Sequence, residues 1–89
     1  MEIELTSDAL NDLQHWKKTG NARILNRVRQ LLESIQTSPF QGIGKPEGLK
    51  GNLSGKWSRR IDQEHRLVYS VNDDKIVVFS LKGHYKLKN

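Results

Sequence analysis

Residues 42–66 read GIGKPEGLKGNLSGKWSRRIDQEHR, and this stretch decides how the rest of the chain is organised. It holds five of the seven glycines and six of the Lys and Arg residues, so its first half is too polar and glycine-rich to form core. A loop of this length in a small domain is usually either functional or disordered. Trp57 favours an ordered loop, because a large aromatic side chain needs a place to pack. The end of the stretch has the pattern of the first hairpin of a sheet.

Before the loop, the pattern first predicts a strand and a helix. Residues 2–6 alternate polar and apolar side chains, which indicates a short, half-buried strand. Ser7 and Asp8 are the candidate N-caps of the helix, which ends near Lys18 and is closed by Gly20. Its apolar positions at helical spacing are Ala9, Leu13 and Trp16.

A second helix is predicted from about Asn21. Pro39 ends this helix by Ser38 at the latest. Because the connection at Gly20 is short, the two helices should form an antiparallel hairpin. The unbroken apolar stripe of the second helix comprises Ile24, Leu25, Val28, Leu31, Leu32 and Ile35.

Three strands are predicted after the loop. They are residues 57–61, 66–71 and 75–81, which alternate or are rich in β-branched and aromatic side chains. Residues 62–65 and 72–74 supply the two turns between them. These three strands should form an antiparallel meander, which the first strand joins at an edge or in the middle.

The expected architecture is a small α+β domain spanning residues 1–89, with β-α-α-β-β-β order and the helix hairpin packed on one face of an antiparallel sheet. The chain has room for one domain with one modest core. On the middle strand, Leu67, Tyr69 and Val71 form the more apolar side and should face the helices. Arg66 then points to the open face, where its charge is not buried.

Composition limits the classes of function. The net charge of +5 and the pI near 9.8 suit either a polyanionic partner or a solvated basic surface. The chain has no cysteine, which excludes a disulfide, a thiolate nucleophile and a Cys-based zinc site. No apolar run approaches the roughly 20 residues of a membrane span, and the acidic start is unlike a signal peptide. We therefore expect a soluble, cytoplasmic protein that does not contact a membrane.

Three familiar kinds of site are not supported by the motifs. Compared with a P-loop, the GIGK segment has Pro39 in place of the first glycine and Pro46 in place of the Ser or Thr. The histidines His15, His65 and His84 have no metal-ligand spacing. A G-x-S-x-G nucleophile elbow is also missing. We therefore expect neither a cofactor nor a metal.

The remaining polar residues include the types that metal-free RNA cleavage requires. A base removes the proton of a 2′-OH, the oxygen attacks the neighbouring phosphate, cations stabilise the developing charge, and an acid protonates the leaving 5′ oxygen. Glu47, Arg66 and His84 can supply these roles if the fold brings them together. Each also has a structural interpretation: a solvated loop carboxylate, an ion pair with Glu64 or Asp62, and an aromatic strand end. Residue types alone leave both interpretations open.

A set of short segments points to one known family. With these segments, the chain resembles the YoeB (Txe/YoeB) toxins of bacterial toxin–antitoxin modules, within the RelE/ParE superfamily. The resemblance covers nearly the whole chain and includes the expected order of elements. The matching segments are SPF at 38–40, GIGKPE at 42–47, LK at 49–50, NLSG at 52–55, WSRRI at 57–61, EHRLVY at 64–69 and HY at 84–85.

The resemblance implies a RelE-like microbial ribonuclease fold and a ribosome-dependent endonuclease that cuts mRNA in the ribosomal A site. Carried over by motif position, Glu47 is the general base, His84 the general acid and Arg66 the phosphate-stabilising cation. Tyr85 would help to position a nucleotide. The basic residues implied to contact RNA are Lys45, Lys50, Arg59 and Arg60.

The resemblance also implies partners and shows some departures. The implied partners are a cognate antitoxin that silences the toxin, the 70S ribosome and mRNA, and the chain would act as a homodimer or within a toxin–antitoxin hetero-oligomer. Gly48 stands where family members commonly have a second proline. Gly83 precedes His84, and residues 86–89 extend past the His-Tyr pair at which family chains tend to stop.

Two other functions stay open at this point. A ParE-like inhibitor of DNA gyrase rests on shared fold class alone, which is weak evidence for function. A basic RNA- or ribosome-binding module without catalysis would bind RNA in a strongly salt-dependent way. By resemblance, the presence of both Glu47 and His84 favours the ribonuclease.

Overall fold

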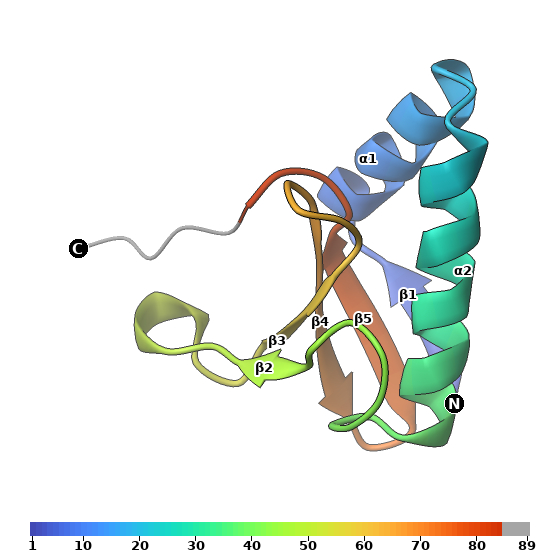
Figure 1. The fold of residues 1–89 in the computed structure, drawn as a ribbon. Coiled ribbons are helices and arrows are strands. Elements are labelled where there is room, and N and C mark those ends of the chain that lie inside the picture. Colours follow the sequence, from blue (N-terminus) through green and yellow to red (C-terminus); the bar gives the residue numbers. More distant parts are fainter. Residues whose placement is uncertain (85–89) are drawn as a thin grey trace.

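The structure, a computed structural model, describes residues 1–84. Within these residues one five-stranded sheet has the order β1-β5-β4-β3-β2, and two helices cover one of its faces (Figure 1). This arrangement confirms the predicted α+β class and the helix hairpin. In chain order, the elements are β1 (Glu2–Leu5), α1 (Ser7–Lys18), α2 (Ala22–Thr37), β2 (Glu47–Gly48), the 3-10 turn η1 (Gly51–Leu53), β3 (Trp57–Arg60), β4 (Arg66–Asn72) and β5 (Lys75–Ser80).

The sheet is mixed, whereas an antiparallel sheet was predicted. The meander β3-β4-β5 is antiparallel as expected, but β1 lies at the sheet edge and pairs in parallel with β5. Its register places Ile3 beside Ile76 and Leu5 beside Val78, so the apolar side chains of both strands face the helices. The strand β2 was not predicted, because two residues are too few to show a periodic pattern.

The first helix begins earlier than predicted. Its N-cap is Thr6, whose Oγ1 accepts a hydrogen bond from the Ala9 N–H at 3.2 Å. The predicted N-caps, Ser7 and Asp8, lie in the first turn instead. The backbone N–H of Thr6 also bonds to the carbonyl of Val78, so this one residue both ends β1 and starts α1.

The second helix has the predicted boundaries. Asn21 is its N-cap, and the side-chain oxygen accepts from the Ile24 N–H at 3.1 Å. Gly20 stands just before it at φ 66°, a left-handed conformation that glycine adopts readily. The helix ends at Thr37, and Ser38 is the C-cap.

The core lies between the helices and the sheet. As predicted, Leu67 and Tyr69 are fully buried there, and Val71 packs against them at the margin. No α-helix among the described residues covers the opposite face, yet Ser58, Val68 and Ser70 on that face are also buried. Within residues 1–84, no helix combines the length and apolarity needed to cross a bilayer. The buried core residues are Ala9, Trp16, Ile24, Val28, Leu31, Ile35, Ile61, Leu67, Tyr69, Ile76, Val78 and Leu81.

Candidate active site

A cleft of about 330 Å³ opens on the face of the sheet away from the helices. The structure brings Glu47, Arg66 and His84 together in this cleft, as the sequence predicted they should meet. The cleft therefore combines a carboxylate, a guanidinium and an imidazole on one surface. The full set of lining residues is Lys45, Pro46, Glu47, Ser58, Arg60, Arg66 and His84.

Strand register explains why these side chains meet. Glu47 on β2 pairs with Ser58 on β3, and Arg60 on β3 pairs with Arg66 on β4. Because side chains alternate along a strand, Ser58 and Arg60 point to the same face. The three neighbouring strands thus present a carboxylate at one edge and two guanidinium groups side by side. Such a basic surface suits a phosphate-bearing ligand.

The segment that leads to Glu47 is folded around one buried arginine. Arg59 alternates with Arg60, so its side chain points into the helix side of the sheet, where it is 0% exposed. Carbonyl groups of the connecting segment turn inward and accept its N–H groups, which satisfies both partners away from water. The acceptors are the carbonyls of Ser38 at 2.6 Å, Gln41 at 2.7 Å and Ile43 at 3.2 Å, Oγ of Ser34 at 2.7 Å and Oη of Tyr69 at 3.2 Å.

This placement corrects the RNA-binding role that the sequence suggested for Arg59. A guanidinium that is fully buried and bonded to internal acceptors on the helix side cannot reach a ligand on the open face. The error arose because Arg59 and Arg60 are adjacent and chemically identical. Alternation along β3 separates them, so Arg60 lines the cleft and Arg59 shapes the segment behind it.

Gly44 lets this segment approach the core closely. Its φ is +85°, and a Cβ added there would lie 2.7 Å from Cδ2 of Leu31 and 3.1 Å from Cβ of Arg59. The carbonyl of Gly44 accepts the N–H of Arg60 at 2.7 Å, which ties the segment to β3. Lys45 follows at φ 51° and turns the chain into the cleft.

Trp57 anchors the far side of the loop, as predicted. Its ring lies 4.8 Å from that of Phe40, centroid to centroid, and packs against the core. Gly48 passes over the same ring, where an added Cβ would lie 3.6 Å from Cζ2. β2, the two-residue strand that carries Glu47, is therefore held both by its pairing with β3 and by the ring of Trp57.

Arg66 does not form the ion pair that was its structural alternative. Its Nη1 donates to three carbonyls, those of Asp62 at 2.8 Å, His65 at 3.2 Å and Gln63 at 3.3 Å. Among the described residues, all hydrogen bonds from this guanidinium use Nη1. The side chain lines the cleft, but it is buried, with only 9% of the residue exposed, so the expectation that its charge is not buried was wrong. The three carbonyls replace hydrogen bonds to water that burial removes.

The Asp62 carboxylate has a different task. Its Oδ1 accepts the backbone N–H groups of Glu64 at 2.9 Å and His65 at 2.7 Å, which closes the turn between β3 and β4. Partial burial raises the pKa of Asp62, but these two hydrogen bonds and the nearby charges of His65 and Arg23 outweigh it, so the pKa lies below its ordinary value. Asp62 thus stabilises the turn that positions Arg66.

The other predicted residues fall in different places. Lys45 and Arg60 line the cleft, whereas Lys50 is exposed at the start of η1 and does not line it. Tyr85 and the extension 86–89 lie outside the described residues. The sequence reasoning missed Ser58, although its position two residues before Arg60 was a usable signal.

Sequence comparison now places the chain. A profile of the YoeB-like toxins of bacterial type II toxin-antitoxin systems matches residues 5–85. Toxin YoeB of Streptomyces coelicolor is 46% identical over 85 residues, which cover 96% of this chain and 100% of that toxin. The chain belongs to the YoeB-like toxin family. It is therefore a toxin of a type II toxin–antitoxin system.

Solved structures of YoeB-like toxins have the same fold. A YoeB/ParE toxin from Agrobacterium tumefaciens superposes with a TM-score of 0.92 at 38% identity, covering 96% of this chain and 100% of that one. A YoeB dimer from Staphylococcus aureus gives a TM-score of 0.88 at 41% identity, over 96% of this chain and 98% of that one. The S. aureus toxin has also been solved as a YoeB-YefM complex.

Proposed function

We propose that this toxin is a ribosome-dependent endoribonuclease that cuts mRNA in the ribosomal A site and so inhibits translation. The observation that supports the proposal is the meeting of Glu47, Arg66 and His84 in one basic cleft. These residues come from three separate parts of the chain, and they are the types that a metal-independent cleavage of RNA needs.

The proposed reaction is an acid–base transfer to the neighbouring phosphate. Glu47 in its ionised form takes the proton of the 2′-OH, and the oxygen attacks phosphorus to form a 2′,3′-cyclic phosphate. The bond from phosphorus to the 5′ oxygen breaks, and protonated His84 gives its proton to that oxygen. Arg66 stabilises the additional negative charge on the phosphoryl oxygens.

The remaining basic residues act on the substrate's backbone in this proposal. Lys45 and Arg60 line the cleft and are placed to contact flanking phosphates. Lys50, exposed outside the cleft, would contact RNA further along the strand. Tyr85 would help to position a nucleotide, as the family resemblance implies.

The proposal includes the partners of the toxin. The net charge of +5 suits both RNA and an acidic antitoxin segment, and the S. aureus relative was solved with YefM. We infer that a cognate antitoxin silences this toxin and that the free toxin forms a dimer, as the S. aureus YoeB dimer suggests. Its site of action would be the cytoplasm, where ribosomes and messages meet.

The test is in vitro translation of a defined message followed by primer extension to locate cuts. The wild type should cut within the A-site codon, and Glu47→Gln and His84→Ala should each cut about 10²- to 10⁴-fold more slowly. His15→Ala is the matched control, because His15 is an exposed histidine on α1 that does not line the cleft. A His84→Ala variant that cuts at the wild-type rate would contradict the mechanism.

Two alternative outcomes identify the competing functions. Intact mRNA together with stalled gyrase cleavage complexes in a supercoiling assay would indicate a gyrase inhibitor. Strong, salt-dependent RNA binding with unchanged growth inhibition in Glu47→Gln would indicate a binding module without catalysis. A short acidic protein encoded immediately upstream, which rescues expression of the toxin when the two are produced together, would support the antitoxin, and light scattering of the free toxin tests the dimer.

A further inference from the structure

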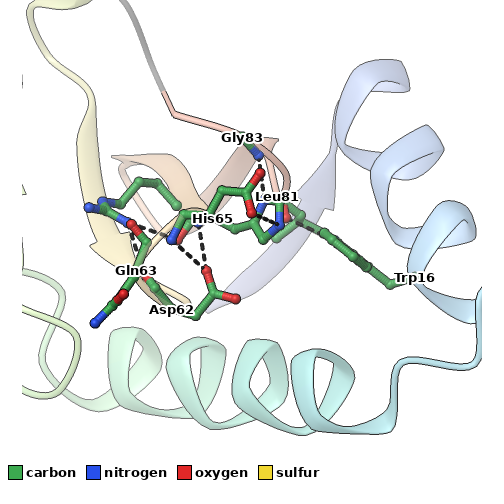
Figure 2. A network of polar contacts seen from close by, with 8 residues as sticks. Trp16, Asp62, Gln63, His65, Leu81 and Gly83 are labelled. Atoms are coloured by element: carbon green, nitrogen blue, oxygen red, sulfur yellow. Dashed lines mark hydrogen bonds and ion pairs between the residues drawn. The ribbon is translucent and has the colours of Figure 1, made fainter.

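The residue before His84 is held by both of its backbone polar groups. The N–H of Gly83 donates to Nδ1 of His65 at 2.8 Å, and the carbonyl of Gly83 accepts the N–H of Arg66 at 3.0 Å (Figure 2). The strand β5 has already ended at Ser80, so the sheet ladder does not hold this segment. Two neighbouring residues at the start of β4 hold it instead.

Among residues 1–84, these two bonds are the restraints on Gly83 that the structure shows. Its φ is +76°, and a Cβ added there would meet no heavy atom within 4 Å. Glycine populates many backbone conformations, so an unrestrained glycine would let the following residue point in many directions. The two hydrogen bonds therefore set the direction in which His84 leaves the segment.

His65 is itself fixed from several sides. Its ring is buried and packs edge-on against Trp16 of α1, with ring centroids 4.7 Å apart. Nε1 of Trp16 donates to the carbonyl of Leu81 at 2.9 Å, so the same tryptophan also holds the start of the segment (Figure 2). The backbone N–H of His65 donates to Asp62 at 2.7 Å. The acceptor at Nδ1 is thus rigidly placed.

The hydrogen bond also defines the tautomer. Because Nδ1 accepts a hydrogen bond from the N–H of Gly83, the ring proton of the neutral imidazole lies on Nε2, 3.7 Å from Oε1 of Glu64. This side chain therefore acts as an acceptor toward Gly83. A side chain of similar size without an acceptor would keep the packing on Trp16 and lose the restraint.

We propose that His65 is a positioning residue for cleavage, which holds Gly83 so that His84 is presented to the cleft in a reactive direction. This inference rests on the proposed function, since it takes His84 as the acid. The sequence reasoning considered His65 only as a metal ligand and set it aside. Its role is to align another histidine, and it does not touch the RNA.

The first test separates the acceptor from the packing. His65→Leu keeps an apolar side chain against Trp16 but has no acceptor, whereas the Oδ1 of His65→Asn lies close to where Nδ1 was. A misplacement of about 1 Å costs about 10²-fold in rate, so His65→Leu should lower kcat by about that factor with KM little changed. His65→Asn should recover at least about tenfold of this loss, although it loses the ring contact and should be the less stable of the two.

His15→Leu is the matched control for this pair. The His15 ring also packs edge-on against Trp16, at 4.8 Å, but it has no contact with Gly83. It should cut at the wild-type rate. If cleavage by the variants followed their melting temperatures instead of the presence of an acceptor, His65 would be only structural and the proposal would be overturned.

A double-mutant cycle tests whether His65 acts through His84. In the His84→Ala background, His65→Leu should cause no further loss of cleavage, because the acid that it aligns is gone. If the double variant instead cut more slowly by the product of the two separate rate losses, the proposal would be overturned. Wild-type protein that does not cleave mRNA would overturn the proposed function, and with it this role. Cleavage that needs His84 but tolerates His65→Leu would overturn the positioning role alone.

The hydrogen bond is measurable without catalysis. In ¹⁵N-labelled protein, an N–H···N bond gives a scalar coupling between the amide nitrogen of Gly83 and Nδ1 of His65. We expect this coupling in the wild type and slowed exchange of the Gly83 amide proton, with both lost in His65→Leu. A wild-type spectrum without the coupling would overturn the proposal even if the variants folded poorly.

Discussion

Glu47 reaches the cleft from a segment folded around a buried arginine, whereas His84 reaches it from a segment that two backbone hydrogen bonds hold. In residues 38–44, three carbonyls turn inward to the guanidinium of Arg59. In residues 81–84, by contrast, a Cβ added at Gly83 would meet no heavy atom of the described residues within 4 Å. The first segment is therefore held by a buried side chain beneath it, whereas the second leaves the core at Leu81 and is held at Gly83 by backbone hydrogen bonds alone.

The difference separates stability from alignment. Changes in residues 38–44 should destabilise the whole protein, because they leave buried polar groups without partners. Changes at Gly83, past the core residue Leu81, should leave the fold largely intact and alter mainly the direction of His84. In this toxin the two proposed proton-transfer groups would therefore respond to mutation in different ways.

The largest effect is expected for Arg59→Met. It removes five donated hydrogen bonds and leaves buried carbonyls unpaired, so the free energy of unfolding should fall by about 3–5 kcal/mol. Urea unfolding followed by circular dichroism measures the change. If Arg59→Met lowered the urea midpoint by less than Arg60→Met does, the buried network would not be what holds the segment.

Arg60→Met is the control for Arg59→Met. The two residues are adjacent on β3 and carry the same side chain, but only Arg60 lines the cleft. An exposed substitution of this kind changes stability by about 0.5 kcal/mol or less. Arg60→Met should instead weaken the binding of RNA, with a smaller dependence of affinity on salt.

The two segments can be compared directly through their glycines. Gly44→Ala adds a Cβ 2.7 Å from Leu31 at a φ of +85°, so both overpacking and backbone strain apply and we expect a loss of about 3 kcal/mol. Gly83→Ala has a φ of +76° but no described atom within 4 Å of the added Cβ, so only the backbone strain of about 1–2 kcal/mol applies. Thermal unfolding of the two variants measures this difference.

The cleavage rates of the two variants should show the reverse order when both proteins are folded. Below the melting temperature of both variants, Gly83→Ala should cut more slowly than Gly44→Ala, because it redirects His84 while Gly44→Ala mainly lowers stability. Similar loss of stability in both variants would remove the contrast between the segments.

Most of the fold was predictable from sequence because its elements are long and periodic. The helix α2 shows an apolar stripe over the twelve residues 24–35, begins after Asn21 and ends before Pro39, and each of these features was confirmed. β2 was not predictable, because Glu47 and Gly48 become a strand only by pairing with β3. The parallel pairing of β1 depends in the same way on which sheet edge is free, and local sequence does not contain that information.

Part of the site was also predictable, because side chains alternate regularly along a strand. Alternation along β4 predicted that Arg66 lies on the open face, and the same rule applied to β3 would have separated Arg59 from Arg60. A buried arginine with only neutral partners is rare, so the usual expectation that arginine is exposed prevailed. The contact between His65 and Gly83 joins residues 18 positions apart through a loop, and no periodic pattern announces it.

A smaller loss of stability is expected for Tyr69→Phe. The hydroxyl of Tyr69 donates to the carbonyl of Pro39 at 2.6 Å and accepts from Arg59, so Tyr69→Phe should cost about 1–2 kcal/mol by leaving both partners unpaired. Burial raises the pKa of Tyr69, although its hydrogen bond from Arg59 and the charge of Arg59 oppose this. The folded state therefore holds the phenol proton more tightly than the unfolded state does.

The sign of the resulting pH dependence follows from that raised pKa. The stabilisation is fully present below the unfolded value of 10.0 and is lost as the pH rises through the higher folded value. Urea unfolding from pH 9 upward should show the wild type losing its advantage over Tyr69→Phe. A constant difference between the two proteins across this range would mean that the phenol does not titrate differently on unfolding.

The smallest effect is expected for Asp62→Asn, in the turn on the His84 side of the cleft. The amide oxygen still accepts the backbone N–H groups of Glu64 and His65, so only the charge is lost and the cost should be about 0.5 kcal/mol or less. Because the folded pKa of Asp62 is lowered, this difference should be present above about pH 3.8 and disappear as the pH falls through the folded value. Cleavage at neutral pH should hardly change, since the amide still places His65 against Gly83. A large loss of cleavage without a loss of stability would mean that the carboxylate charge itself, and not the geometry of the turn, aligns His84.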